Sequence, residues 1–143
     1  MDNVNVRKVV SIDVDNLTGE MQDLPASTQT WASHAAEAAH AAAKAKATYE
    51  QVYARACEDI RNGAAARGEK LTETRVENRA RLTMEVVVAV SEMGTANYNL
   101  ARIKAVVEAL AAKRDMLIQL GSTQREEIKQ EIRVNGNRST TRK

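Results

Sequence analysis

The two histidines, His34 and His40, lie in one alanine-rich stretch of the chain, residues 33–50. Because they are six residues apart, a helix would place them about 240° apart around its axis, on different faces. One metal ion could not contact both from the same chain. Glu37 lies three residues from each and could pair with either, which is ordinary chemistry of a helix surface. We therefore predict no metal site and expect the histidines to face solvent or another subunit.

Cysteine chemistry and phosphate-binding loops are equally unsupported. Cys57 is the only cysteine, so it cannot form an internal disulfide, and acids and bases flank it on both sides. We expect it to be a small, buried helix residue in a reducing compartment. The stretch GAAARGEK, residues 63–70, lacks the spacing and the preceding strand of a P-loop. The sequence therefore predicts a protein that is not an enzyme and holds no cofactor.

A basic stretch, residues 55–81, is the remaining candidate for a site. On charge alone a solvated surface is the stronger interpretation, because five acids lie among seven bases. If the helices form a ring, however, one modest patch per subunit becomes a continuous track, and weak phosphate contacts add up to salt-sensitive binding. Aromatic side chains are scarce, so such binding would follow the nucleic-acid backbone and tolerate any sequence. The candidate contacts are Arg55, Arg61, Arg67, Lys70, Arg75 and Arg79.

Composition indicates which elements would position these residues. Hydrophobic residues make up 43% of the 143 residues, yet phenylalanine is absent, tryptophan occurs once, and alanine supplies much of the total. One proline and six glycines leave few places where a helix must end. We therefore predict a single all-α domain of long helices packed through small side chains. The net charge of +2 by itself favours neither nucleic acid nor membrane.

Two heptad stripes predict a long antiparallel helical hairpin over residues 25–120. The first stripe begins at Trp31, which we interpret as a core anchor, and is mostly alanine. Either stripe could face the same chain or a neighbouring subunit. The first consists of Trp31, Ala35, Ala38, Ala42, Ala45, Tyr49, Val52 and Ala56; the second contains Val86, Met93, Leu100 and Val107 at one heptad position and Ala89, Ala96, Ile103, Leu110 and Leu117 at the other.

The expected helix boundaries follow from residues that start or end helices, such as proline and glycine. The first helix should begin near Pro25 and end near Arg61, or one turn later at Gly68. A short intervening helix is expected over Glu73–Arg81, and the second long helix should end near Gly121. Residues 1–24 alternate weakly, which predicts a short strand or, since no partner strand is evident, an extended arm that docks on a neighbouring subunit. Residues 121–143 predict a short helix followed by a disordered basic tail.

The expected localisation follows from two segments that the sequence lacks, a membrane span and a signal peptide. No apolar run approaches the roughly 18 residues of a membrane span. The N-terminus lacks the basic region and hydrophobic core of a signal peptide. We therefore expect a cytoplasmic protein without a membrane partner.

Four segments resemble the UvsY-type recombination mediators of tailed bacteriophages and prophages. They are LPASTQTWASHAAEAA, a long helix ending in EDIR, GEKLTETRVE, and ALAAKRDMLIQLGSTQREE, and the resemblance covers about residues 24–128. Its most specific parts are the turn at residues 70–73 and the segment 109–121. The alanine-rich first helix is weaker support, since any closely packed helix could look similar.

The resemblance implies a small helical protein that assembles into a homo-oligomeric ring, commonly of six or seven subunits. Such a protein binds single-stranded DNA non-specifically and helps a RecA-like recombinase displace the single-strand-binding protein. In that family the DNA-contacting bases lie towards the end of the first long helix. This implies a role for Arg55 and Arg61, with Arg67 and Lys70 just beyond, while Tyr53 stands where a further base would be expected.

Two other functions stay open on sequence alone. The chain could be a phage structural protein or scaffold chaperone that uses the same hairpin to hold another protein and does not bind DNA. It could also be a small inhibitor that docks its helical face on a host defence enzyme. The first predicts oligomers without salt-dependent DNA binding, and the second predicts tight binding to one protein without self-assembly.

Overall fold

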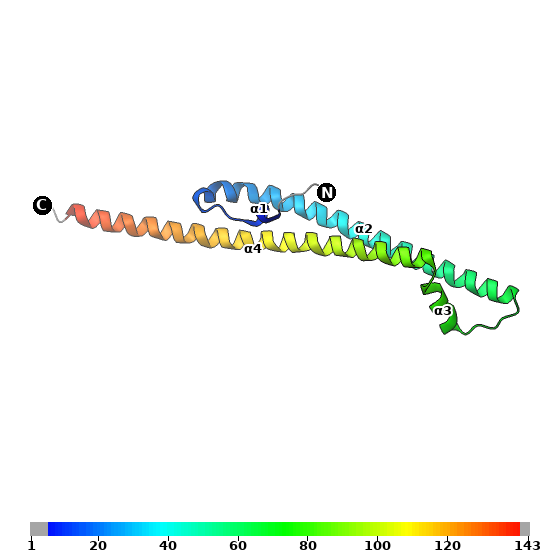
Figure 1. Cartoon of the computed structure of the whole chain (residues 1–143). Coiled ribbons are helices and arrows are strands. Elements are labelled where there is room, and N and C mark those ends of the chain that lie inside the picture. The colour runs from blue at the N-terminus through cyan, green and yellow to red at the C-terminus, as the bar shows by residue number, and fades with distance from the viewer. Residues whose placement is uncertain (1–5, 141–143) are drawn as a thin grey trace. The chain divides into compact units, whose positions relative to one another are not determined.

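The computed structural model describes residues 6–140 of the chain, with side chains described for residues 6–133. All regular elements in this range are helices (Figure 1). The predicted all-α class with a long helix pair is therefore confirmed. In chain order the elements are α1 (Val6–Val10), the 3-10 helix η1 (Val14–Asn16), α2 (Leu17–Ala66), α3 (Glu73–Arg81) and α4 (Met84–Thr140).

The N-terminal arm is helical where the sequence predicted an extended segment. The side-chain carbonyl of Asn16 accepts a hydrogen bond from the Gly19 N–H at 3.2 Å, which satisfies one of the free donors at the start of a helix. As a result α2 begins at Leu17, and Pro25 lies inside it. The predicted extended arm is thus wrong for most of residues 6–24, and residues 1–5 lie outside the described part.

Helix α4 continues through the predicted stop at Gly121 and ends at Thr140. A glycine costs about 1 kcal/mol within a helix but does not end it without turn geometry. A Cβ built at Gly121 would lie 3.0 Å from the terminal methyl carbon of Met21, which is the end of a flexible side chain and can shift to make room. The separate short helix and the disordered tail are therefore wrong up to residue 140, and residues 141–143 lie outside the described part.

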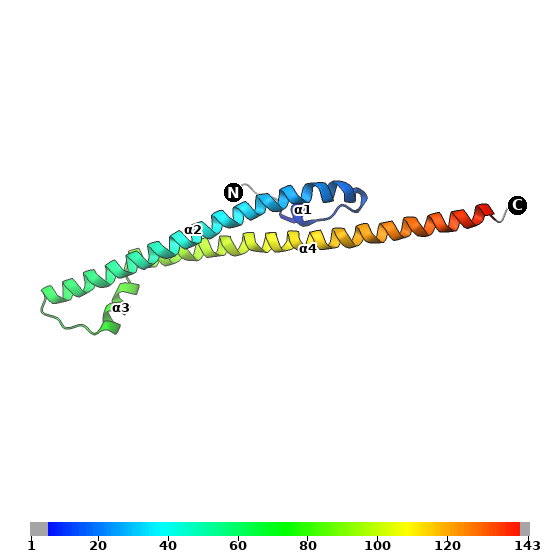
Figure 2. The same cartoon turned by 180° about the vertical axis from the view of Figure 1, so that it is seen from behind.

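The chain divides into two compact units. Unit 1 comprises residues 1–32 and 105–143, and unit 2 comprises residues 33–104. Each contains one segment of α2 and one of α4, and Figures 1 and 2 show these segments lying side by side and antiparallel. Unit 1 adds α1 and η1, whereas unit 2 adds α3.

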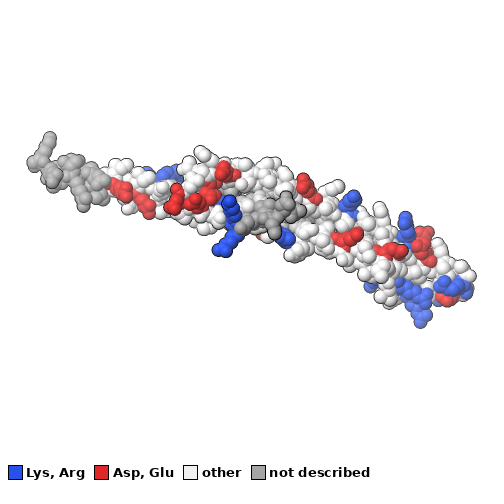
Figure 3. Space-filling model, turned by 45° about the horizontal axis from the view of Figure 1, so that its top comes forward, with Lys and Arg blue, Asp and Glu red and all other residues white. Residues whose placement is uncertain are grey.

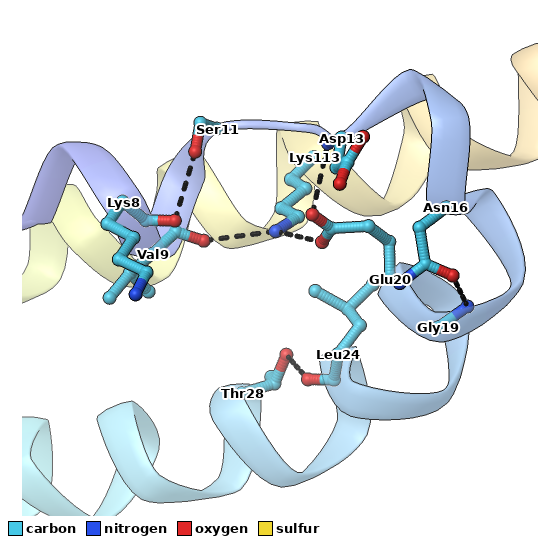
Figure 4. A network of polar contacts seen from close by, with 10 residues as sticks. All are labelled: Lys8, Val9, Ser11, Asp13, Asn16, Gly19, Glu20, Leu24, Thr28 and Lys113. Atoms are coloured by element: carbon cyan, nitrogen blue, oxygen red, sulfur yellow. Dashed lines mark hydrogen bonds and ion pairs between the residues drawn. The ribbon is translucent and has the colours of Figure 1, made fainter.

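In unit 1 a lysine of α4 holds the N-terminal segment. Lys113 is 8% exposed; its ammonium forms an ion pair with Glu20 and donates a hydrogen bond to the Val9 carbonyl at 3.1 Å (Figure 4). Glu20 also accepts a hydrogen bond from the Asp13 N–H at 3.0 Å. These contacts tie α1, the link to α2, and α4 together.

In unit 2 the short helix α3 completes the core. Its Val76 and Ala80 pack with residues of α2 and with Val86 at the start of α4. Around this centre the rings of Tyr49 and Tyr53 stack with centroids 5.9 Å apart. The prediction that Cys57 is a buried helix residue is confirmed, since it lies in the same cluster and is 6% exposed.

Every residue of the two heptad stripes is buried or half-buried, including Trp31 in unit 1. In unit 2 the stripe residues Ala56 and Val86 meet in one core. Packing within the chain therefore explains why these residues repeat at heptad spacing. That the stripes also form an interface between subunits stays a prediction.

The core of the described part is built largely from small side chains. Of the twelve hydrophobic residues buried there, six are alanine or cysteine.

None of the described helices combines the length and the apolar character that crossing a membrane requires.

Candidate nucleic-acid interface

The basic stretch is organised by the way α2 ends. Gly68 adopts a φ of +72°, a conformation that glycine accepts without steric cost. Its N–H donates to the Ala65 carbonyl at 3.0 Å, and the next N–H, of Glu69, donates to the Ala64 carbonyl at 2.9 Å. This pair of bonds is the Schellman motif, which satisfies the last carbonyls of a helix. Of the two predicted stops, Arg61 and Gly68, the later one is used.

The Schellman turn places Glu69 between two arginines. The Nε of Arg67 donates to Oε1 of Glu69 at 3.4 Å, and Nη1 of Arg79 on α3 lies 3.8 Å from Oε2. Both contacts are long, and all three side chains are roughly half exposed. Exposed ion pairs of this kind contribute little to stability and exchange readily with other ions. The carboxylate therefore holds two guanidinium groups near each other without sequestering them.

Two more arginines are paired with acids. Arg61 on α2 forms a hydrogen-bonded ion pair with Glu73 in the first turn of α3, and this hydrogen bond raises the pKa of Arg61 above its usual value. Arg81 lies 3.9 Å from Glu77, one turn earlier on α3. The contact between Arg61 and Glu73 links the end of α2 to α3, which gives Arg61 a structural role beside any role in binding.

Three of the predicted contacts have no such partner. Arg55 on α2, Lys70 in the turn and Arg75 on α3 are exposed and form no ion pair with any described residue. Their charges are thus the most available for a phosphate. Figure 3 shows basic side chains gathered around α3 and the end of α2, with acids among them.

A shallow hollow of about 330 Å³ lies between α2 and the start of α4. Arg67 and Arg79 line one part of it, but Asp59 and Glu85 line it as well. This mixture of charges does not form a closed anion site.

The described part of the chain contains no group of three or more histidine, cysteine or acidic side chains that could hold a metal ion. Nδ1 of His34 lies 3.6 Å from Glu37, one of the two pairings expected from the spacing. Tyr53 contacts the Cys57 region of the core, and this burial raises the pKa of its phenol.

The sequence did not reveal that Glu69 and Glu73 pair with arginines, or that Lys113 is buried. Glu69 and Glu73 are visible in the sequence only as charges that dilute the basic stretch, since their partners depend on how α3 folds back. Lys113 left no such signal, because the heptad position of Val107 continues to Arg114 and not to Lys113. The structure instead exposes Arg114 and buries Lys113.

Neither a known protein family nor any curated protein or solved structure matches the chain.

Proposed function

We propose that the chain is a phage-type recombination mediator. It binds single-stranded DNA non-specifically and assists a RecA-like recombinase in displacing the single-strand-binding protein, in the cytoplasm of the host cell. It acts as a homo-oligomeric ring of six or seven copies and needs no cofactor or nucleotide hydrolysis. The resemblance to UvsY-type mediators names the activity, and the arginine pair bridged by Glu69 is the structural observation that supports it.

The bridged arginines suit a phosphodiester. Glu69 presents one oxygen to each arginine at 3.4 and 3.8 Å, and two non-bridging oxygens of a phosphate could replace them. Lys70 lies next to Glu69 in the turn and is unpaired, so it supplies a further charge at the same place. No aromatic platform lies in this turn, which favours contacts to the backbone over stacking on bases.

Mechanistically, each copy contributes a few exchangeable phosphate contacts, and the assembly multiplies them. A single patch with net charge near +2 would bind a strand weakly. Repeated around a ring, the same patch binds strongly at low salt and releases as salt rises. A strand held in this way is presented to the recombinase without any chemical step by the mediator.

The test uses fluorescence anisotropy of labelled oligo-dT with the wild-type chain and Glu69→Gln. Because glutamine removes the resident charge between Arg67 and Arg79, we expect affinity to rise by roughly threefold or more. Glu58→Gln is the matched control, since Glu58 lies nearby on α2, forms no ion pair with a described residue and loses the same charge. It should raise affinity less.

A second experiment reverses the charge of three basic side chains. Replacing Arg67, Lys70 and Arg79 with glutamate should weaken binding equally for oligo-dT and mixed sequences and flatten its dependence on salt between about 50 and 200 mM. Wild-type protein that fails to bind at about 50 mM salt would refute the proposal. Equal effects of Glu69→Gln and Glu58→Gln would leave DNA binding intact but remove the bridged pair from it.

A further inference from the structure

The first turn of α3 is held to the rest of unit 2 by few contacts. Nine residues are too few for a helix to be stable on its own, so α3 depends on what it packs against. Val76 and Ala80 fix its middle and its end in the core, and Leu71 is half-buried just before it. Residues 72–75 are exposed, and the side chain of Thr72 makes no capping hydrogen bond. The placement of the first turn therefore depends on exposed polar side chains.

One ion pair joins this turn to α2. Nη2 of Arg61 donates a hydrogen bond to Oε1 of Glu73, twelve residues further along the chain. This hydrogen bond is the main reason why the pKa of Arg61 is raised. Glu73 is also the first residue of α3, where the partial positive charge of a helix N-terminus favours a carboxylate. The same carboxylate thus suits the start of α3 and holds that start against α2.

The other ion pairs of the basic stretch connect different parts. The pair of Glu77 lies within α3, and those of Glu69 reach a neighbour in the turn and a residue of α3, at 3.4 and 3.8 Å. Among the described ion pairs of residues 55–81, the one between Arg61 and Glu73 alone joins α2 to α3. It is therefore the polar contact best placed to fix α3 against the end of α2.

The placement of α3 determines where Arg79 lies. Arg79 is six residues beyond Glu73, which is about 9 Å along the helix. Its Nη1 lies 3.8 Å from one oxygen of Glu69, and Nε of Arg67 lies 3.4 Å from the other. Without the pair at its start, the first turn of α3 loses its fixed place, and the shorter helix that remains holds Arg79 less firmly.

We propose that Arg61 and Glu73 are a positioning pair, which holds α3 in place so that the two arginines bridged by Glu69 can share one phosphate. Arg61 itself does not contact the strand. This inference rests on the proposed DNA binding and removes one residue from its phosphate contacts. The two roles make opposite predictions. If Arg61 were a contact, Glu73 would compete with the phosphate for it, and removing the carboxylate would strengthen binding.

The test measures binding of labelled oligo-dT to Glu73→Gln by fluorescence anisotropy. Because glutamine removes the charge that holds Arg61, we expect affinity to fall by about two- to threefold, an effect of the size that an exposed ion pair can have. The control is Glu77→Gln, which removes the same charge from the same helix but breaks a pair that lies within α3. It removes a charge that repels DNA and keeps the link to α2, so affinity should stay the same or rise.

A double-mutant cycle separates positioning from contact. If Arg61 acts only through Glu73, Arg61→Gln should weaken binding in the wild-type background and change it by less than about twofold in the Glu73→Gln background. A phosphate contact would instead be lost in both backgrounds. Equal losses of affinity in the two backgrounds would therefore overturn the proposal.

Hydrogen–deuterium exchange of the free protein examines the helix without DNA. Amides of residues 75–81 should exchange faster in Glu73→Gln than in the wild type or Glu77→Gln, while those of α2 and α4 keep their rates and show that the fold is retained. Unchanged exchange in α3, or tighter binding by Glu73→Gln than by Glu77→Gln, would overturn this proposal alone. Wild-type protein that does not bind oligo-dT would overturn it together with the proposed function.

Discussion

Lys113 and Glu20 show how much a single buried pair can organise in a small core. Lys113 is the only buried charged residue in the described part of the chain, and its ammonium reaches both Glu20 and the Val9 carbonyl. The carbonyl lies near the end of α1, where helix carbonyls lack partners of their own. A five-residue helix has little stability in isolation, so α1 depends on this contact.

The pair predicts a specific dependence on pH. The hydrogen bond from Lys113, together with the one from the Asp13 N–H, lowers the pKa of Glu20 below 4.5. A carboxylate with a lowered pKa contributes stability that is complete above pH 4.5 and is lost as pH falls through its folded-state pKa. Glu20→Gln should therefore cost about 1–2 kcal/mol of unfolding free energy at pH 7 and progressively less below pH 4.5.

Urea titrations of the wild type and Glu20→Gln across pH check this expectation. Asp23→Asn serves as the control, because Asp23 lies on the same helix and forms no ion pair with a described residue. A free-energy difference between wild type and Glu20→Gln that stays constant from pH 7 to pH 3 would contradict the account of this pair.

The elements show which features can be predicted from local sequence. Thr72 precedes α3 in extended conformation, and α3 has the predicted bounds, Glu73–Arg81. The long helices follow their heptad stripes for the same reason, since one buried face repeats along each. The start of α2 was missed because Pro25 is a strong start signal, whereas the cap that acts is the side chain of Asn16.

Two glycines near the end of α2, Gly63 inside the helix and Gly68 in the turn that follows it, should respond in opposite ways to the same substitution. Gly68→Ala forces a left-handed conformation on a residue with a Cβ and should destabilise unit 2 by about 1 kcal/mol. Gly63→Ala should stabilise it by up to about 1 kcal/mol, because a Cβ there meets only the end of the Arg67 side chain, at 3.5 Å. Thermal or urea unfolding of both variants measures the difference, and stabilisation by Gly68→Ala would contradict the turn.

The sequence predicts where along the chain the candidate site lies, but not which of its side chains form ion pairs. The run of bases from Arg55 to Arg79 is evident in the sequence, and the structure brings the end of α2 next to α3. Which bases are paired depends on contacts across the turn, such as that between Glu69 and Arg79, ten residues apart. Periodicity identifies the buried face of a helix, but it does not reveal the partner of an exposed charge.

At the scale of the whole molecule, association and DNA binding are complementary parts of one proposal. A core built largely from alanine and other small side chains supports the proposal that the chain is completed by other copies. A basic patch with little net charge needs the same repetition to hold a strand. The proposed mediator function therefore requires both properties together in the wild-type chain.

Sedimentation velocity of the full chain, with and without labelled oligo-dT over a series of salt concentrations, tests this claim most directly. We predict one discrete assembly that persists without DNA, binds oligo-dT at about 50 mM salt and releases most of it by about 200 mM. A monomer that does not bind oligo-dT at any salt concentration would contradict the account.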